Sequence, residues 1–162
     1  MPTFNIARAG STYPKLARNA VPVGTIFKLI ESEDRLGHAT YLNVGNLGSR
    51  YYSLRLSDKC VTATTNTSRE VAMVGKATIN NTFYEAAEQL DKRLSDMDAG
   101  TLFIVKGKVN PDDLPIAFAL IGRNDTDEHI ALDLSAPGTI VKFRANQPVT
   151  VVGRYGITGV EV

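Results

Sequence analysis

Residues 71–79 read VAMVGKATI and residues 149–157 read VTVVGRYGI, with valine, valine, glycine and isoleucine at matching places. A shift of 78 residues aligns 39–79 with 117–157 without a gap, and ten of the 41 aligned pairs are identical. This pattern indicates an internal duplication of one unit. Two unrelated β segments that share valine-rich strands and glycine turns are the alternative.

A second match lies upstream and supports the duplication. GTIF at 24–27 corresponds to GTLF at 100–103, at a shift of 76 that places a two-residue difference in an intervening loop. We therefore expect four segments: a basic N-terminal arm at 1–22, a first β unit at 23–80, a linking segment at 81–98 and a second β unit at 99–162.

Apolar residues alternate with polar ones inside each copy. In RYYSLRL at 50–56, the apolar Tyr52, Leu54 and Leu56 alternate with the other side chains, which is the period of a strand with one buried face. Similar runs predict about five strands in each unit, separated by segments with turn chemistry such as NPDDLP at 110–115.

The repeated figure itself predicts a bulged last strand in each unit. Val71 and Val74 are three residues apart, so a regular strand cannot turn both to the same side. A bulge at Gly75 would reset the buried face, and the glycine at 153 would repeat it. A second interpretation stays open, in which the Gly-Lys and Gly-Arg pairs at 75–76 and 153–154 contact phosphate.

The linking segment has the pattern of an amphipathic helix over 83–97. Thr82 and Glu85 match a capping box. One apolar stripe then follows at spacings of four and three: Phe83, Ala87, Leu90, Leu94 and Met97. The expected fold class is therefore α+β, mainly antiparallel β, with two pseudo-equivalent units of about five strands joined by this helix. That order is similar to the layout of Whirly-type single-stranded nucleic-acid-binding proteins, a resemblance of layout alone.

Composition places the chain among soluble globular proteins of one compact fold. The hydrophobic fraction is 43% and the charged fraction 22%, and Cys60 is the only cysteine, so no internal disulfide can form. The N-terminus has no continuous apolar core of a secretion signal, and no apolar run approaches the roughly 20 residues of a membrane span. We expect a cytoplasmic protein without membrane contact.

Charge is unevenly distributed along the chain. The net charge is +1, but residues 1–80 hold ten Lys or Arg against five Asp or Glu, whereas residues 81–162 hold eight against twelve. This asymmetry predicts one basic and one acidic surface.

Catalytic and cofactor motifs are not found in the sequence. There is no nucleophile elbow, P-loop or HExxH pattern, and we expect no cofactor. The densest group of potential metal ligands is RNDTDEH at 123–129, where Asp125, Asp127 and His129 are weak candidates. A metal-dependent enzyme that uses this loop is the third-ranked function, because a charged hairpin tip explains the same residues.

Basic and aromatic residues on outward strand faces favour a non-enzymatic module that binds single-stranded DNA or RNA. Aromatic rings on a sheet stack on bases, and interleaved cations follow the phosphates. The alternative is a protein-binding, inhibitory or structural assembly protein, viral or encoded by a mobile element, with a protein partner or a second copy of itself. The candidate nucleic-acid-binding residues are Arg8, Lys15, Arg18, Lys28, Tyr41, Tyr51, Arg55, Lys76, Lys142, Arg144, Arg154 and Tyr155.

Overall fold

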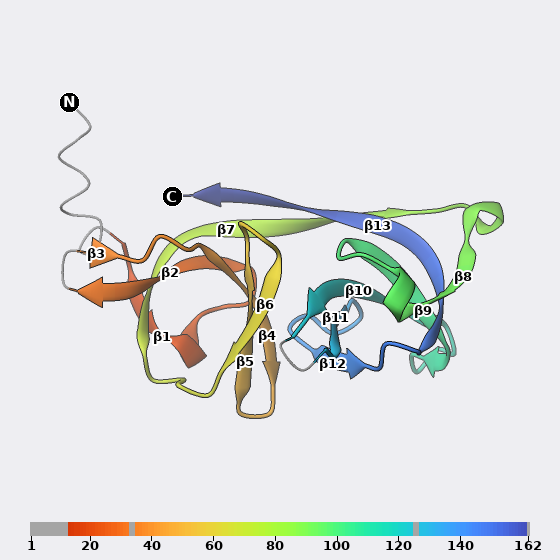
Figure 1. Cartoon of the computed structure of the whole chain (residues 1–162), viewed down its shortest axis with the longest axis horizontal. Helices are drawn as coiled ribbons and strands as arrows, with labels where there is room; N and C mark the ends of the chain where they lie inside the picture. The colour runs from red at the N-terminus through yellow and green to blue at the C-terminus, as the bar shows by residue number, and fades with distance from the viewer. Residues whose placement is uncertain (1–12, 33–34, 125–126, 162) are drawn as a thin grey trace.

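A computed structural model describes residues 13–32, 35–124 and 127–161, with the last two residues as backbone only. Antiparallel strands form one 13-stranded sheet that curls strongly (Figure 1). The strands are β1 Lys15–Ala17, β2 Thr25–Ser32, β3 Arg35–Leu36, β4 Tyr41–Leu47, β5 Arg50–Arg55, β6 Cys60–Thr64, β7 Glu70–Phe83, β8 Leu90–Arg93, β9 Thr101–Val109, β10 Pro115–Arg123, β11 His129–Asp133, β12 Ile140–Phe143 and β13 Pro148–Glu161. Within these described ranges, three short 3-10 helices interrupt the strands: η2 Arg18–Ala20, η3 Ala86–Glu88 and η4 Leu94–Asp96.

The predicted α+β fold class, with two units joined by an amphipathic helix, is wrong. In the described residues no helix exceeds three residues, and none is long and apolar enough to span a membrane. Residues 83–97 instead complete β7 and form η3, β8 and η4, with β8 hydrogen-bonded along β13. An isolated helix of this length is only marginally stable in water, so pairing with a sheet edge outweighs the local helical pattern. The resemblance to the Whirly-type layout loses its basis with the helix.

The strands form one continuous sheet because β7 and β13 pair with each other. Nine residue pairs join the two strands, which run side by side along one side of the molecule in Figure 1. The order from edge to edge is β12-β11-β10-β9-β13-β7-β2-β4-β5-β6. Every strand of residues 13–83, the first half, except β3 thus has a counterpart in residues 84–161, the second half.

The registers of the paired strands show that the sequence shift between the two halves changes along the chain. It is 76 in β2, 77 in β4 and 78 in β5 and β7, because the β9–β10 and β10–β11 connections each have one residue more than the β2–β4 and β4–β5 connections. The gapless alignment at 78 is therefore one residue out of register in β4. Leu42 corresponds to Ala119 and not to Leu120.

The bulge predicted at Gly75 is confirmed. The register of β2 on β7 shifts between Met73 and Gly75, and that of β9 on β13 shifts between Val151 and Gly153. Val74 is the extra residue in β7. It is buried in the core that both halves share, whereas Val71 is buried on the opposite face of the sheet, so the bulge does not turn the two valines to one side as the sequence pattern predicted.

Apolar side chains form one core shared by both halves. A separate cluster lies on the opposite face of each half, which is turned away from the shared core and which we call the outer face. The shared core takes Ile26, Leu42, Leu54 and their neighbours from the first half together with Leu102, Ile130 and others from the second. The outer cluster of the first half contains Val21, Phe27 and Val71. The outer cluster of the second half is larger and contains Leu94, Met97, Phe103, Val105, Phe118, Leu120, Ala131, Phe143 and Val149.

Candidate anion-binding pocket

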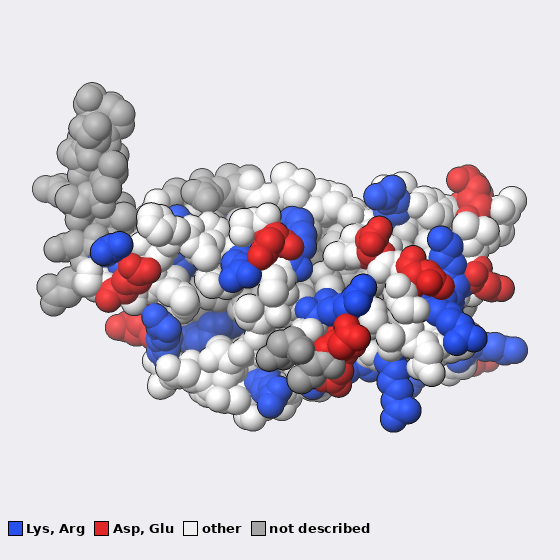
Figure 2. Space-filling model, viewed as in Figure 1, with Lys and Arg blue, Asp and Glu red and all other residues white. Residues whose placement is uncertain are grey.

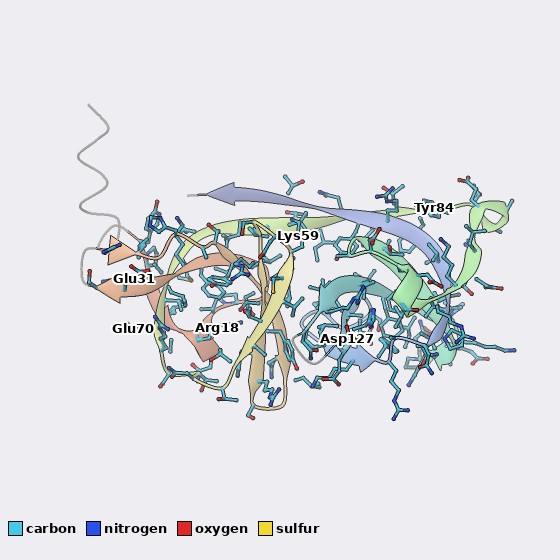
Figure 3. All side chains as sticks on the ribbon, in the orientation of Figure 1. Arg18, Glu31, Lys59, Glu70, Tyr84 and Asp127 are labelled. Carbon is cyan, nitrogen blue, oxygen red and sulfur yellow. The ribbon has the colours of Figure 1, made fainter. Side chains whose placement is uncertain are left out.

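Arg18 is a buried cation on the outer face of the first half. β1 pairs with β7 through Ala17 and Glu70, and η2 follows at once, so Arg18 lies across the strands of its own half. The backbone N–H of Arg18 donates to the carbonyl of Arg69 at 2.8 Å, which fixes the turn. Only 3% of the residue is exposed, although arginine is almost never fully buried without a charged partner. Figure 3 places Arg18 inside the curve of the first-half strands.

One nitrogen of the guanidinium has several acceptors and the other two have none. Nη2 donates to Asn43 Oδ1 at 3.0 Å, to the carbonyl of Tyr52 at 3.0 Å and to Ser53 Oγ at 2.9 Å. Nε and Nη1 are buried and have no hydrogen-bond partner in the described part of the chain. None of the ion pairs among the described residues includes Arg18. Burial away from water lowers the pKa of Arg18 to about 10, so the group stays charged near neutral pH.

Aromatic rings surround the guanidinium. Its carbon lies 4.9 Å from the ring centre of Phe27 and 5.5 Å from that of Tyr51, within cation–π range. Tyr41 stacks on Phe27 with ring centres 5.6 Å apart. Three residues that the sequence analysis selected, Arg18, Tyr41 and Tyr51, are therefore brought together at one place.

A cavity of about 190 Å³ adjoins Arg18, and we call it the Arg18 pocket. Its walls come from β2, β4, β5, β6, β7 and the loop between β6 and β7. The lining residues are Arg18, Phe27, Leu29, Tyr41, Ser53, Thr62, Ala63, Thr64, Asn66, Arg69 and Val71.

The second half is apolar at the positions that correspond to this polar cluster. Leu94 is the counterpart of Arg18, because each is the first residue of a 3-10 helix that follows a short strand. The last residues of these strands, Ala17 and Arg93, pair with Glu70 and Pro148, which are 78 residues apart. Asn43 pairs with Ser53 across β4 and β5, as Leu120 pairs with Ala131 across β10 and β11. These three second-half residues belong to one buried apolar cluster. The same strand arrangement thus forms without Arg18, Asn43 and Ser53, so the fold itself does not require them.

Phe143 fills the space in the second half that the Arg18 pocket leaves open in the first. Phe143 is the counterpart of Thr64, because Thr64 pairs with Tyr51 in the first half and Phe143 pairs with His129, the counterpart of Tyr51, in the second. The Phe143 ring packs edge-on against Phe103 and Phe118, with ring centres 5.6 and 5.2 Å away. The pocket is therefore the result of a small side chain at position 64.

The other predicted nucleic-acid-binding residues do not gather around the pocket. Arg8 lies outside the described residues. Exposed positions on separate strands or turns hold Lys15, Lys76, Arg144 and Arg154, and Lys28 is half-buried on β2. On the face that Figure 2 shows, Lys and Arg alternate with Asp and Glu, so no continuous basic surface is visible there.

Two of the predicted cations form ion pairs with acidic neighbours, and one predicted tyrosine forms a hydrogen bond with the backbone. Arg55 donates to both carboxylate oxygens of Asp58, at 2.9 and 2.7 Å, which raises the pKa of Arg55 and lowers that of Asp58 to about 2. Lys142 Nζ lies 3.5 Å from Glu128 Oε1. The hydroxyl of Tyr155 donates to the carbonyl of Leu120, and burial raises its pKa to about 12.

The weak metal candidates do not assemble into a ligand set where the structure describes them. Asp125 lies outside the described residues. Asp127 is exposed and accepts a hydrogen bond from Arg123 at 3.3 Å, while His129 is buried in β11. Across the described ranges, no group of three His, Cys, Asp or Glu side chains is placed to hold a metal ion.

Sequence reasoning missed Asn43, Ser53, Phe27 and Arg69 as parts of the site. A signal was present for three residues, because Arg18, Asn43 and Ser53 each have an apolar counterpart in the second half. The comparison needed the shifts of 76 and 77, which the gapless alignment at 78 did not provide.

Comparisons with protein-family models, with characterised proteins and with solved structures find no match to this chain.

Proposed function

We propose that the protein is a non-enzymatic module that binds single-stranded DNA or RNA through the outer face of its first half. The observation that supports this proposal is the convergence of Arg18, Tyr41 and Tyr51. Both tyrosines are half-buried, so part of each ring is open to a ligand. Stacking on such rings and charge contact with a guanidinium are the two interactions that single strands use.

The number of phosphate contacts is expected to be small. Arg55 and Lys142 are already partnered by acidic side chains, and exposed cations such as Lys15 and Lys76 lie on separate strands. Arg18 and Arg69 line the same pocket as Phe27 and Tyr41. The single, half-buried cysteine suits a reducing compartment, so we place this activity in the cytoplasm.

Fluorescence anisotropy with labelled single-stranded 20-mers of DNA and RNA, measured across a salt series, tests the proposal. About four phosphate contacts predict a log–log slope of affinity against salt near −3. Tyr51→Ala should weaken binding by about 1–3 kcal/mol through lost stacking and leave the slope nearly unchanged. Lys108→Gln, at an exposed position of the second half, is the matched control and should bind as the unmodified protein does.

Two outcomes would contradict the proposal. One is no binding of either 20-mer at low salt, which would favour the alternative of a protein partner. The other is binding that Tyr51→Ala leaves unchanged, because general electrostatic attraction does not depend on the tyrosines.

A further inference from the structure

We propose that the Arg18 pocket receives a terminal phosphate monoester, so that the protein recognises a phosphorylated end of a single strand. This inference rests on the proposed function and assigns a specific part of the ligand to a specific site. The structure leaves a buried positive charge without a negative partner among the described residues. An isolated buried charge is strongly unfavourable, and a bound anion would remove that cost.

The hydrogen-bond pattern leaves donors for an anion. A guanidinium has five N–H donors, and Nη2 has only two of them for the acceptors on Asn43, Tyr52 and Ser53. The three N–H groups on Nε and Nη1 are the unpartnered ones. Because Nη2 is held by three groups on β4 and β5, the guanidinium plane is fixed before a ligand arrives.

Hydroxyl groups at the pocket add further donors. Ser53 Oγ accepts a hydrogen bond from Arg18, and Thr64 Oγ1 accepts one from the backbone N–H of Asn66 at 3.0 Å. Each hydroxyl therefore keeps its own hydrogen for an acceptor of the ligand. No Asp or Glu lines the pocket, so the described walls present donors and apolar groups but no carboxylate to repel an anion.

Charge and chain connectivity favour an end of the strand over an internal phosphate as the occupant of the pocket. A phosphodiester continues in two directions and would need two exits for the strand. A monoester needs one exit and carries a charge of about −1.5 to −2 at neutral pH, which makes it the better partner for a buried guanidinium. Tyr41, in the wall of the pocket, is placed to stack on the adjoining base.

The experiment compares three labelled 20-mers of one sequence, with a 5′-phosphate, with a 3′-phosphate and with hydroxyl groups at both ends. Inorganic phosphate, added alone at millimolar concentration, is the fourth probe, and its readout is the melting temperature of the protein. We expect one phosphorylated end to bind at least about tenfold tighter than the hydroxyl strand, a difference of about 1.4 kcal/mol. We also expect inorganic phosphate to raise the melting temperature.

Two variants test the pocket by different routes. Arg18→Leu copies the residue of the second half and removes the cation. Thr64→Phe copies Phe143 and fills the cavity while Arg18 stays in place. Either variant should abolish the preference for a phosphorylated end, with circular dichroism as the check that the sheet is intact. Lys106→Gln, at an exposed position of β9 in the second half, should keep the preference.

The outcomes separate the two proposals. If the hydroxyl strand binds and neither terminal phosphate changes its affinity by more than twofold, the assignment of the pocket is overturned and the proposed function stands. If inorganic phosphate stabilises the protein through Arg18 while no strand binds, the pocket is an anion site and the proposed function is overturned. If the preference for a phosphorylated end survives in a folded Thr64→Phe, the phosphate binds elsewhere and the inference fails.

Discussion

Ile79 of β7 lies directly opposite Ile157 of β13, and the two residues are 78 positions apart. On either side of this pair the partners exchange, since Asn80 pairs with Gly156 and Thr78 pairs with Thr158. A local two-fold axis therefore passes between Ile79 and Ile157. The same relation between equivalent residues is found where two copies of one chain form a symmetric dimer.

A fragment that ends after β7 should use the same contact between two copies. Residues 1–84 contain one side of the shared core and one strand of the central pair, so the fragment exposes both when it is alone. We expect it to form a dimer, because a second copy offers a nearly equivalent surface. Light scattering after size-exclusion chromatography measures the mass. A folded monomer would show that the shared core is not needed.

Gly153 lies where the backbone of β13 comes close to that of β7, opposite Phe83. A Cβ atom built on Gly153 would lie against the Thr82 carbonyl and 3.0 Å from Phe83 Cα, and backbone atoms cannot move away easily. Gly153→Ala should lower the free energy of unfolding by about 1–3 kcal/mol, the usual cost of overpacking. Gly156→Ala on the same strand meets nothing within 4 Å and should change it by less than about 0.5 kcal/mol. Urea unfolding followed by circular dichroism compares the two, and equal effects would contradict the close approach.

The polar cluster of the first half should cost stability relative to its apolar counterpart. The triple variant Arg18→Leu, Asn43→Leu, Ser53→Ala carries the residues found at 94, 120 and 131. Replacing a buried ionic group by packed apolar residues is often stabilising by about 1–4 kcal/mol, and we expect a gain in that range from the same urea experiment. The reverse change, Leu94→Arg, should destabilise by about 3–5 kcal/mol, because the second half has no polar groups to receive the charge. A triple variant that is less stable than the unmodified protein would mean that the cluster supports the fold.

Leu90 and Leu94 distinguish the observed segment from the helix that the sequence predicts. A helix would bury both on one stripe, whereas in the structure Leu90 is 56% exposed and Leu94 is completely buried. Leu94→Ala should therefore cost about 2–5 kcal/mol, and Leu90→Ala less than about 0.5 kcal/mol. Thermal melts of the two variants measure this difference. Comparable losses at both positions would restore the helical arrangement.

Local patterns predicted the strands and the bulge but not the way in which the segments pair. The alternation around Tyr52 and Leu54 is visible in the sequence, and the repeated glycine at 75 and 153 marks the bulge. The spacing of Val71 and Val74 does not, because the two valines lie on opposite faces of the sheet. The secondary structure of residues 83–97 could not be predicted from local patterns. Its apolar spacing fits a helix, and only the free edge of β13, which comes much later in the chain, selects the extended form.

Part of the candidate site was also predictable from local patterns, namely the residue types and their alternation along each strand. Arg18, Tyr41 and Tyr51 have suitable chemistry on outward positions and were selected on that basis. Asn43 and Ser53 appeared to be ordinary polar residues of a solvated face, and their burial depends on η2 crossing the sheet above them.

His129 should make the stability of the protein depend on pH. It is 1% exposed, and neither ring nitrogen has a hydrogen-bond partner among the described residues. Burial away from water, with a smaller contribution from the positive Arg123, lowers the pKa of His129 below its ordinary 6.5. The unfolded chain therefore binds a proton at a higher pH than the folded protein does, and stability falls as the pH decreases from about 6.5 towards the folded pKa.

Urea unfolding at pH 7.5 and at steps down to pH 5 should show this loss, and His129→Phe should reduce it. His38→Gln, at an exposed histidine, is the matched control and should keep the loss. A pH dependence that is the same in His129→Phe as in the unmodified protein would assign it to the carboxylates instead.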